Sequence, residues 1–243
     1  MKLLVLAGTG EARAIAARLA AERVDAVASL AGAVRAPRKL ALPTRIGGFG
    51  GEDGFRTYLA EEGIGAVLDA THPFAVRISR RTATMCRDMG VPYCQFLRPE
   101  WAPEPGEDWA RISTEEQAVE IIPEGAVVLL ATGRQTAARF ARLKRRRVIC
   151  RVVEEQAEPF PFDGGEYLVQ RPPFSLEHEL ALFRQLAIDW LVAKNAGGAA
   201  GRAKLDAARQ LGVRVAMLDR PEQPEGRKAE TVDAALAWVR GLE

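Results

Sequence analysis

The sequence contains few of the residues that build disulfide scaffolds and metal centres: only three cysteines and two histidines occur among 243 residues. The cysteines, Cys86, Cys94 and Cys150, are odd in number and widely spaced. This excludes a fully paired disulfide framework and provides no zinc-ligand spacing. We therefore expect reduced, buried thiols in a cytoplasmic protein, and no bound metal.

Long apolar runs and a strong charge bias are also missing. No apolar segment approaches the roughly 20 residues that a membrane span needs. Residues 1–7 are too short for a signal peptide and lead directly into a glycine loop. The net charge is only +2, and no aromatic residue interrupts the basic run 142–147. We therefore expect a soluble cytoplasmic protein without membrane or nucleic-acid partners; the pattern predicts no oligomeric state.

Short apolar runs alternating with helical patterns are what the sequence does contain. In the first half, strands are expected at 2–7, 26–30, 42–46, 66–68 and 93–97, and helices at 11–22, 52–62 and 76–89. After a proline-rich segment, 98–106, strands are expected at 127–131, 148–153, 167–169, 190–193 and 213–218, and helices at 135–143, 176–188, 200–211 and 231–242. This alternation predicts an α/β protein with two Rossmann-like domains, mostly parallel sheets and an interdomain cleft. The predicted domains are 1–98 and 99–243.

The loop Gly8-Thr9-Gly10-Glu11 leaves the first expected strand and opens the first helix. Glycines let backbone N–H groups approach a pyrophosphate, and a helix N-terminus favours negative charge. Arg13 replaces the third glycine of G-x-G-x-x-G, so an ordinary tight turn remains the alternative. The position favours a nucleotide site.

Two further segments of the first half fit the same site. Ser29 lies at the end of the second strand and Arg35 follows it, without the carboxylate that an NAD-preferring site would place there. This predicts NADPH, and a solvated basic loop is the alternative. The loop Gly48-Phe49-Gly50 combines close backbone approach with one flat apolar face. Covering an adenine or a macrocycle and forming a flexible loop are equally good interpretations of it.

The segment 69–75 ends an apolar run and precedes a helical pattern, so it should lie at the ligand-binding edge of a sheet. Thr71 and His72 offer hydrogen bonds to a cofactor, and Pro73 restricts the backbone of His72. His72 is also a candidate proton donor, and helix capping is the alternative to either role. We expect cofactor contact rather than proton transfer.

The second half repeats these strand-end loops and adds positive charge. Between Arg134 and Arg151 there are eight basic residues and no acidic one. Much of the run 142–147 is expected to form a solvated helix face. Arg134, Arg151 and Arg171 are expected to converge on a polyanionic ligand. The loop that contains Lys194, Asn195, Gly197 and Gly198 is expected to bind an anion or an amide of the substrate.

Taken together, these loops resemble those of the precorrin-6A reductase family of cobalamin biosynthesis. The matching segments, in order, are 6–12, 29–32, 47–51, 69–75, 98–101, 133–135, 171–174, 194–198 and 219–221. Two positions depart from the family pattern: Ala196 stands where a serine is usual, and Pro172 where a glycine is usual.

The resemblance implies a two-domain α/β reductase that holds NADPH in the cleft and reduces a double bond of the macrocycle precorrin-6A to give precorrin-6B. It implies a cationic surface for the acetate and propionate groups of that tetrapyrrole, and His72 and Lys194 as catalytic candidates. A cobalt-precorrin-6A reductase, a dinucleotide-dependent reductase of another polyanionic substrate, and a non-enzymatic nucleotide sensor are the alternatives.

Overall fold

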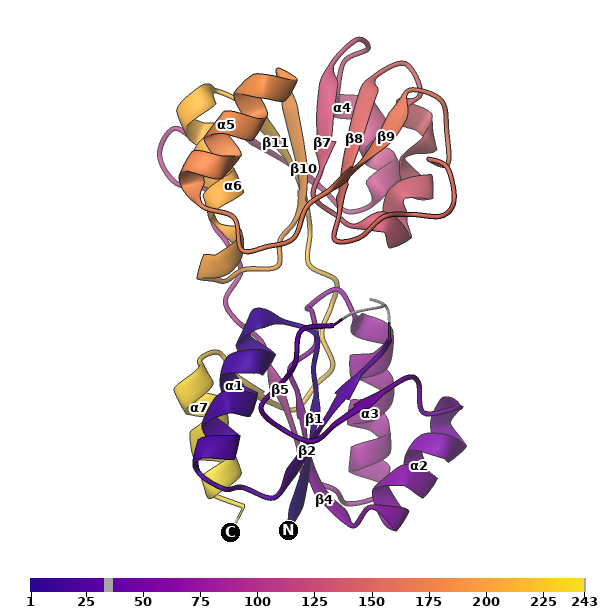
Figure 1. Cartoon of the computed structure of the whole chain (residues 1–243), viewed down its shortest axis with the longest axis vertical. Helices are drawn as coiled ribbons and strands as arrows, with labels where there is room; N and C mark the ends of the chain where they lie inside the picture. Colours follow the sequence, from indigo (N-terminus) through magenta and orange to yellow (C-terminus); the bar gives the residue numbers. More distant parts are fainter. Residues whose placement is uncertain (33–36, 243) are drawn as a thin grey trace. The chain divides into compact units, whose positions relative to one another are not determined.

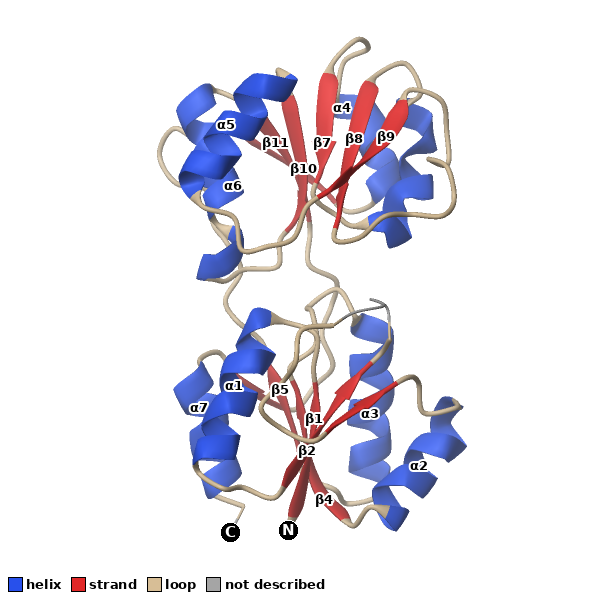
Figure 2. Cartoon of the chain, in the orientation of Figure 1, coloured by secondary structure: helices blue, strands red, loops and turns tan. Residues whose placement is uncertain are grey.

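The chain folds into two compact units, described here from a computed structural model of residues 1–32 and 37–242. Unit 1 comprises Met1–Pro99 and Pro221–Glu243, and unit 2 comprises Glu100–Arg220. In each unit, helices cover both faces of a six-stranded parallel sheet (Figures 1 and 2). The predicted α/β class with two Rossmann-like domains is confirmed.

The sheet of unit 1 has the strand order β12-β5-β4-β1-β2-β3. Its strands are β1 (Lys2–Leu6), β2 (Ala26–Leu30), β3 (Thr44–Ile46), β4 (Ile64–Asp69), β5 (Tyr93–Phe96) and β12 (Arg227–Ala229). Its helices are α1 (Gly10–Ala21), α2 (Gly51–Glu61), α3 (Val76–Asp88) and α7 (Val232–Arg240). This is the order of doubly wound nucleotide-binding sheets, in which ligands bind where the winding reverses, between β1 and β4.

Alternate side chains of β1 build the two apolar layers of unit 1. Leu3 and Val5 pack in the cluster that includes residues of α1 and α7. Leu4 and Leu6 pack in the cluster that includes residues of α2 and α3. A strand buried on both faces is a continuous apolar run, as the sequence of β1 shows.

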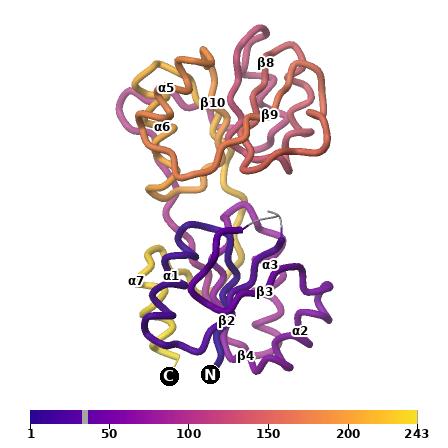
Figure 3. The backbone as a smooth tube through the Cα atoms, viewed as in Figure 1, coloured from indigo at the N-terminus to yellow at the C-terminus, as the bar shows by residue number. Residues whose placement is uncertain are grey.

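The C-terminal segment belongs to unit 1, which corrects the predicted second domain of 99–243. β12 pairs in parallel with β5, with Arg227 opposite Cys94. Ala235, Leu236 and Val239 of α7 are buried in the same cluster as α1. Thr231 caps α7 as expected, because its hydroxyl accepts a hydrogen bond from Ala234 N at 3.1 Å. Both chain ends therefore lie in unit 1 (Figure 3).

The sheet of unit 2 has the order β6-β11-β10-β7-β8-β9. Its strands are β6 (Trp109–Ile112), β7 (Val127–Leu130), β8 (Arg147–Val152), β9 (Gly165–Val169), β10 (Trp190–Lys194) and β11 (Arg214–Leu218). Its α-helices are α4 (Ala118–Ile121), α5 (Leu176–Leu186) and α6 (Ala203–Leu211), and its 3₁₀ helices are η1 (Glu115–Gln117), η2 (Arg134–Leu143) and η3 (Ala199–Gly201). The winding of this sheet reverses between the adjacent strands β7 and β10. The chain continues from β7 to β8 on one side of this point and from β10 to β11 on the other.

Some of the predicted elements differ locally from those in the structure. The helix expected at 135–143 is present as a 3₁₀ helix. The strand expected at 42–46 is only three residues long. β6 and β12 were not predicted, because each is a short run containing charged residues that becomes a strand only by pairing with β11 or β5.

The three cysteines are buried and free, as expected. Burial raises the pKa of Cys86 to about 12 and the pKa values of Cys94 and Cys150 to about 11. They are therefore protonated thiols at neutral pH. Within residues 1–32 and 37–242, no helix is both long and apolar enough to cross a membrane. The same residues contain no cluster of His, Cys, Asp or Glu suited to a metal ion.

Candidate functional site

The two loops singled out in unit 1 are directly connected at the point where the winding of the sheet reverses. Leu6 at the end of β1 lies opposite Asp69 at the end of β4. Thr9 Oγ1 donates a hydrogen bond to Ala70 O at 3.0 Å and accepts one from Ala12 N at 3.0 Å, which caps α1. One threonine therefore orients the helix N-terminus and ties it to the loop after β4.

The backbone around Gly8 and Gly10 is open on the side where side chains would project. A Cβ added to either glycine would meet no atom within 4 Å, and Gly8 has φ +150°. Open space beside a helix N-terminus is what a phosphate-binding turn requires. The carboxylate of Glu11, by contrast, forms an ion pair with Arg98 at 3.0 Å. Glu11 therefore holds the end of β5 against the start of α1.

A buried carboxylate organises the loop after β4 (residues 70–75). Asp69 is fully buried, and its Oδ1 accepts hydrogen bonds from Thr71 N at 3.0 Å and Thr71 Oγ1 at 2.7 Å. Its Oδ2 accepts a bond from the Tyr93 hydroxyl at 2.9 Å, and burial with the Asp69 charge raises the pKa of Tyr93. Because the Thr71 hydroxyl donates to Asp69, its oxygen acts as an acceptor toward any further partner.

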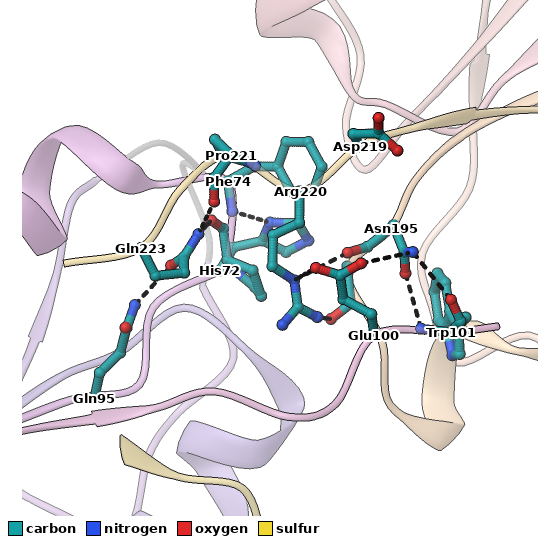
Figure 4. Close-up of polar contacts among 12 residues, drawn as sticks. His72, Phe74, Gln95, Glu100, Trp101, Asn195, Asp219, Arg220, Pro221 and Gln223 are labelled. Atoms are coloured by element: carbon teal, nitrogen blue, oxygen red, sulfur yellow. Dashed lines mark hydrogen bonds and ion pairs between the residues drawn. The ribbon is translucent and has the colours of Figure 1, made fainter. Parts of the chain in front are cut away.

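His72 has a defined orientation in this loop (Figure 4). Its Nδ1 accepts a hydrogen bond from Phe74 N at 3.2 Å. In the neutral imidazole this contact assigns the proton to Nε2, which makes that nitrogen a donor. The neighbouring Pro73 is buried.

The C-terminal segment reaches back to the same loop. Gln223 Nε2 donates to Pro73 O at 3.0 Å, and Gln95 Nε2 donates to Gln223 Oε1 at 2.8 Å (Figure 4). The sequence provides no signal for this contact, because Gln223 and Pro73 are 150 positions apart. It follows from the return of residues 221–243 to unit 1.

Ser29, at the end of β2, lies opposite Arg45 of β3. Arg45 Nη1 donates to Ser29 Oγ at 2.9 Å and to Gly47 O at 2.9 Å, and its Nη2 donates to Gly48 O at 2.8 Å. Arg45 was not among the predicted site residues. Its place two residues before a glycine pair was the available signal. Arg35, which was predicted, lies outside the described residues.

The glycine-rich loop after β3 (residues 47–50) carries Phe49 against two aromatic rings. Phe49 makes edge contacts with Phe55 at 4.8 Å and Tyr58 at 5.2 Å between ring centroids. A Cβ added to Gly48 or Gly50 would meet no atom within 4 Å, so the loop backbone is accessible beside this fixed ring. The loop therefore has open backbone beside one apolar ring, and its contact with a ligand stays a prediction.

In unit 2 as well, a side chain connects the two loops at the edge where the winding of the sheet reverses. Lys194, at the end of β10, donates from Nζ to Thr132 O at 2.7 Å and so joins the loops after β10 and β7. Burial lowers the pKa of Lys194, while Glu115 and Cys150 act in the opposite direction. Gly133 has φ +79°, Gly198 has φ +84°, and each directly precedes a 3₁₀ helix. Arg134 is exposed at the first residue of η2.

Asn195 and Arg220 use their side chains to hold the residues that enter and leave unit 2 (Figure 4). Asn195 Oδ1 accepts from Trp101 N at 2.9 Å, and its Nδ2 donates to Trp101 O at 3.0 Å and Glu100 Oε2 at 3.3 Å. Arg220 donates to Asn195 O at 3.2 Å and Ala196 O at 3.1 Å. The hydrogen-bonding groups of the Asn195 side-chain amide are therefore satisfied within the protein.

Arg151 is also committed within the protein. Its two terminal nitrogens pair with the two carboxylate oxygens of Glu179, each at 2.7 Å, and both side chains are buried. The Phe174 ring covers the guanidinium with 4.4 Å between Arg151 Cζ and the ring centroid. Arg171 is exposed and donates to Val153 O at 3.0 Å. The expected convergence of Arg151 with the other cations on a ligand is therefore not supported by its contacts.

Comparison with known proteins agrees with this architecture. Residues 2–240 match the family model described as precorrin-6x reductase CbiJ/CobK. A precorrin-6A reductase of Rhodococcus erythropolis is 44% identical, covering 99% of this chain and 98% of that protein. The solved structure of a CobK precorrin-6A reductase superposes with a TM-score of 0.96 at 39% identity, covering 99% of this chain and 96% of that one. A cobalt-precorrin-6A reductase of Methanothermobacter thermautotrophicus is 30% identical, covering 91% of this chain and 77% of that protein.

The two parallel sheets and the matches along the whole chain define an α/β oxidoreductase. The chain belongs to the precorrin-6x reductase family, which acts in cobalamin biosynthesis. The resemblance inferred from the loop segments is thus confirmed.

Proposed function

We propose that the protein reduces a double bond of the metal-free macrocycle precorrin-6A with NADPH and forms precorrin-6B. The observation that carries this proposal is the joined pair of loops at the end of β1 and β4, with open backbone at Gly8 and Gly10. A nicotinamide cofactor is implied by membership of an oxidoreductase family. A biosynthetic reductase of this kind is expected to work in the cytoplasm.

The residues of unit 1 fit a dinucleotide. The N–H groups at the start of α1 would bind the pyrophosphate, because Thr9 caps this helix and the neighbouring glycines leave space. Thr71 would accept and His72 Nε2 would donate hydrogen bonds to polar groups of the cofactor, with Pro73 holding the turn between them and α3. When bound, NADPH supplies the hydride.

The residues of unit 2 fit a substrate with many carboxylates. Lys194 and Arg134 are the principal candidates, because one is half-buried at the sheet edge and the other is exposed next to it along the β7 loop. Gly197 and Gly198 belong to the same loop after β10, and Arg171 adds an exposed cation. Asn195 and Arg151 are assigned to structural roles instead, because their polar groups are engaged by Trp101 and Glu179.

Metal-free precorrin-6A is preferred to its cobalt complex because identity to the named precorrin-6A reductase is 44%, against 30% to the named cobalt-precorrin-6A reductase. The test is to mix the protein anaerobically with NADPH and either macrocycle, and to follow nicotinamide absorbance and the tetrapyrrole product. We expect oxidation of NADPH with precorrin-6A and faster turnover than with NADH. Turnover of the cobalt complex alone would reassign the substrate, and no turnover with either would refute the proposal.

Replacing His72 with alanine should weaken NADPH binding by about tenfold, the size of one lost hydrogen bond to a polar ligand group. The single-turnover rate at saturating NADPH should fall less than the affinity does, because we assign His72 to cofactor positioning. Cofactor titration and stopped-flow kinetics measure the two quantities. His178→Ala removes the other histidine, exposed on α5, and serves as the control. Unchanged affinity with a large fall in rate would make His72 the proton donor.

A further inference from the structure

Arg45 lies where a doubly wound sheet recognises the ribose of a dinucleotide. Such sheets place that group beside the carboxyl end of the second strand. Ser29 stands at this end of β2, and Arg45 of β3 is its register partner, linked through Nη1 to Ser29 Oγ at 2.9 Å. The sequence from residue 29 to residue 51 contains no aspartate or glutamate. The edge therefore offers a cation, held by the hydroxyl of the buried Ser29, where an NAD site offers a carboxylate.

The guanidinium of Arg45 is held in place before any ligand arrives. Its bonds to Ser29 Oγ, Gly47 O and Gly48 O fix the plane of the group. Phe49 covers one side, with 4.0 Å from Arg45 Cζ to the ring centroid, and Tyr58 lies at 5.0 Å. Three of the five N–H donors of an arginine are used by these bonds, which leaves the Nε–H and one Nη2–H for another acceptor. A pre-oriented donor loses little side-chain entropy on binding.

The charge of Arg45 is not neutralised by a carboxylate among the described residues. Its three hydrogen-bond acceptors are all uncharged. None of the ion pairs within residues 1–32 and 37–242 includes it. Arg56 on the nearby helix α2, by contrast, pairs with Asp88 at 3.9 Å. A fixed, uncompensated cation with two donors to spare suits a dianionic phosphate.

We infer that Arg45, oriented by the Ser29 hydroxyl, binds the 2′-phosphate of NADPH and is the residue that sets the preference for NADPH over NADH. The inference rests on the proposed cofactor and assigns its discrimination to one side chain. The alternative is that Arg45 only braces the glycine loop after β3 (residues 47–50). The two roles differ in what a substitution does to NADH, which lacks the phosphate.

The test compares Arg45→Ala and Arg45→Lys with wild type and with Arg56→Ala, an arginine of the same unit that lies outside the proposed site. Catalytic efficiency is measured with NADPH and with NADH. Binding of adenosine 2′,5′-bisphosphate and of 5′-AMP is measured by calorimetry without any macrocycle. Arg45→Ala should lower efficiency with NADPH by about 10- to 100-fold, and change efficiency with NADH by less than about threefold. Arg45→Lys keeps the charge but loses the planar guanidinium. Its catalytic efficiency with NADPH should lie between those of wild type and Arg45→Ala.

The calorimetric binding measurements test this inference independently of the proposed reaction. Arg45→Ala should lose affinity for adenosine 2′,5′-bisphosphate while 5′-AMP binding stays at the wild-type level, whether or not precorrin-6A is turned over. Equal losses of affinity for both nucleotides, or of catalytic efficiency with both cofactors, together with a lower melting temperature, would show that Arg45 only stabilises the loop. A wild-type protein that does not distinguish the two nucleotides would overturn the inference as well.

Discussion

Replacing Glu179 with alanine is expected to destabilise unit 2 by about 3–5 kcal/mol. The substitution leaves the Arg151 guanidinium buried without its bidentate partner, and the cost of an unpaired buried charge exceeds that of most single substitutions. Urea unfolding measures the loss. Fluorescence reports on unit 2, because Trp101, Trp109 and Trp190 belong to it and only Trp238 belongs to unit 1.

The double substitution Arg151→Met with Glu179→Leu is the control for this result. It removes both charges and keeps apolar volume, so it should recover most of the stability lost in Glu179→Ala. The buried Arg151 Nε already has no hydrogen-bond partner, so the pair is not fully satisfied in the native protein. A Glu179→Ala protein as stable as wild type would show that the Arg151 charge reaches solvent. That result would return Arg151 to the set of substrate-binding candidates.

Replacing Lys194 with methionine is expected to lower kcat/KM for precorrin-6A by about 10- to 100-fold while leaving NADPH affinity unchanged. A hydrogen bond to a charged group contributes about 1.5–3 kcal/mol, which corresponds to that range. Steady-state kinetics and cofactor titration measure the two effects. Lys144→Met removes an exposed lysine of the same unit and should leave both unchanged. A loss of NADPH affinity in Lys194→Met would place Lys194 at the cofactor instead.

The same lysine predicts a pH dependence. Burial lowers the pKa of Lys194 from its ordinary value of 10.5, so the side chain loses its proton at a lower pH than an exposed lysine. Carboxylate binding needs the cation, which predominates below this pKa. We therefore expect kcat/KM to fall as the pH rises through it, and Lys194→Arg to abolish this alkaline fall. An unchanged alkaline limb in Lys194→Arg would assign the titration to another group.

Much of the fold could be predicted from the chain because its signals are local. β1 and β4 each contain an uninterrupted run of buried apolar residues, 3–6 and 66–68, and each strand is followed by a loop and a helix. Parallel strands place such loops at one sheet edge, which is why Gly8–Glu11 and Thr71–Pro73 were expected to face one site. Thr9 and Thr231 cap their helices through bonds three residues along the chain, a distance at which sequence patterns are informative.

The contacts that change the interpretation of single residues are long-range. Arg151 and Arg134 look alike in sequence, yet one is buried against Glu179 of α5 and the other is exposed. Asn195 directly follows Lys194, but its side-chain amide is hydrogen-bonded to the backbone of Trp101, 94 positions away. The role of Arg45 depends on the pairing of β3 with β2, because only that register sets it beside Ser29.

The sequence by itself determined the α/β class, the strand-end loops that carry the candidate site, and the family, because glycine turns, apolar strands and helix caps act over a few residues. Only the tertiary structure decided which charged side chains are neutralised, and that residues 221–243 complete the first sheet rather than the second. Both depend on pairing between segments distant in the chain. The free energy of such pairing comes from burial and hydrogen bonds that no local pattern encodes.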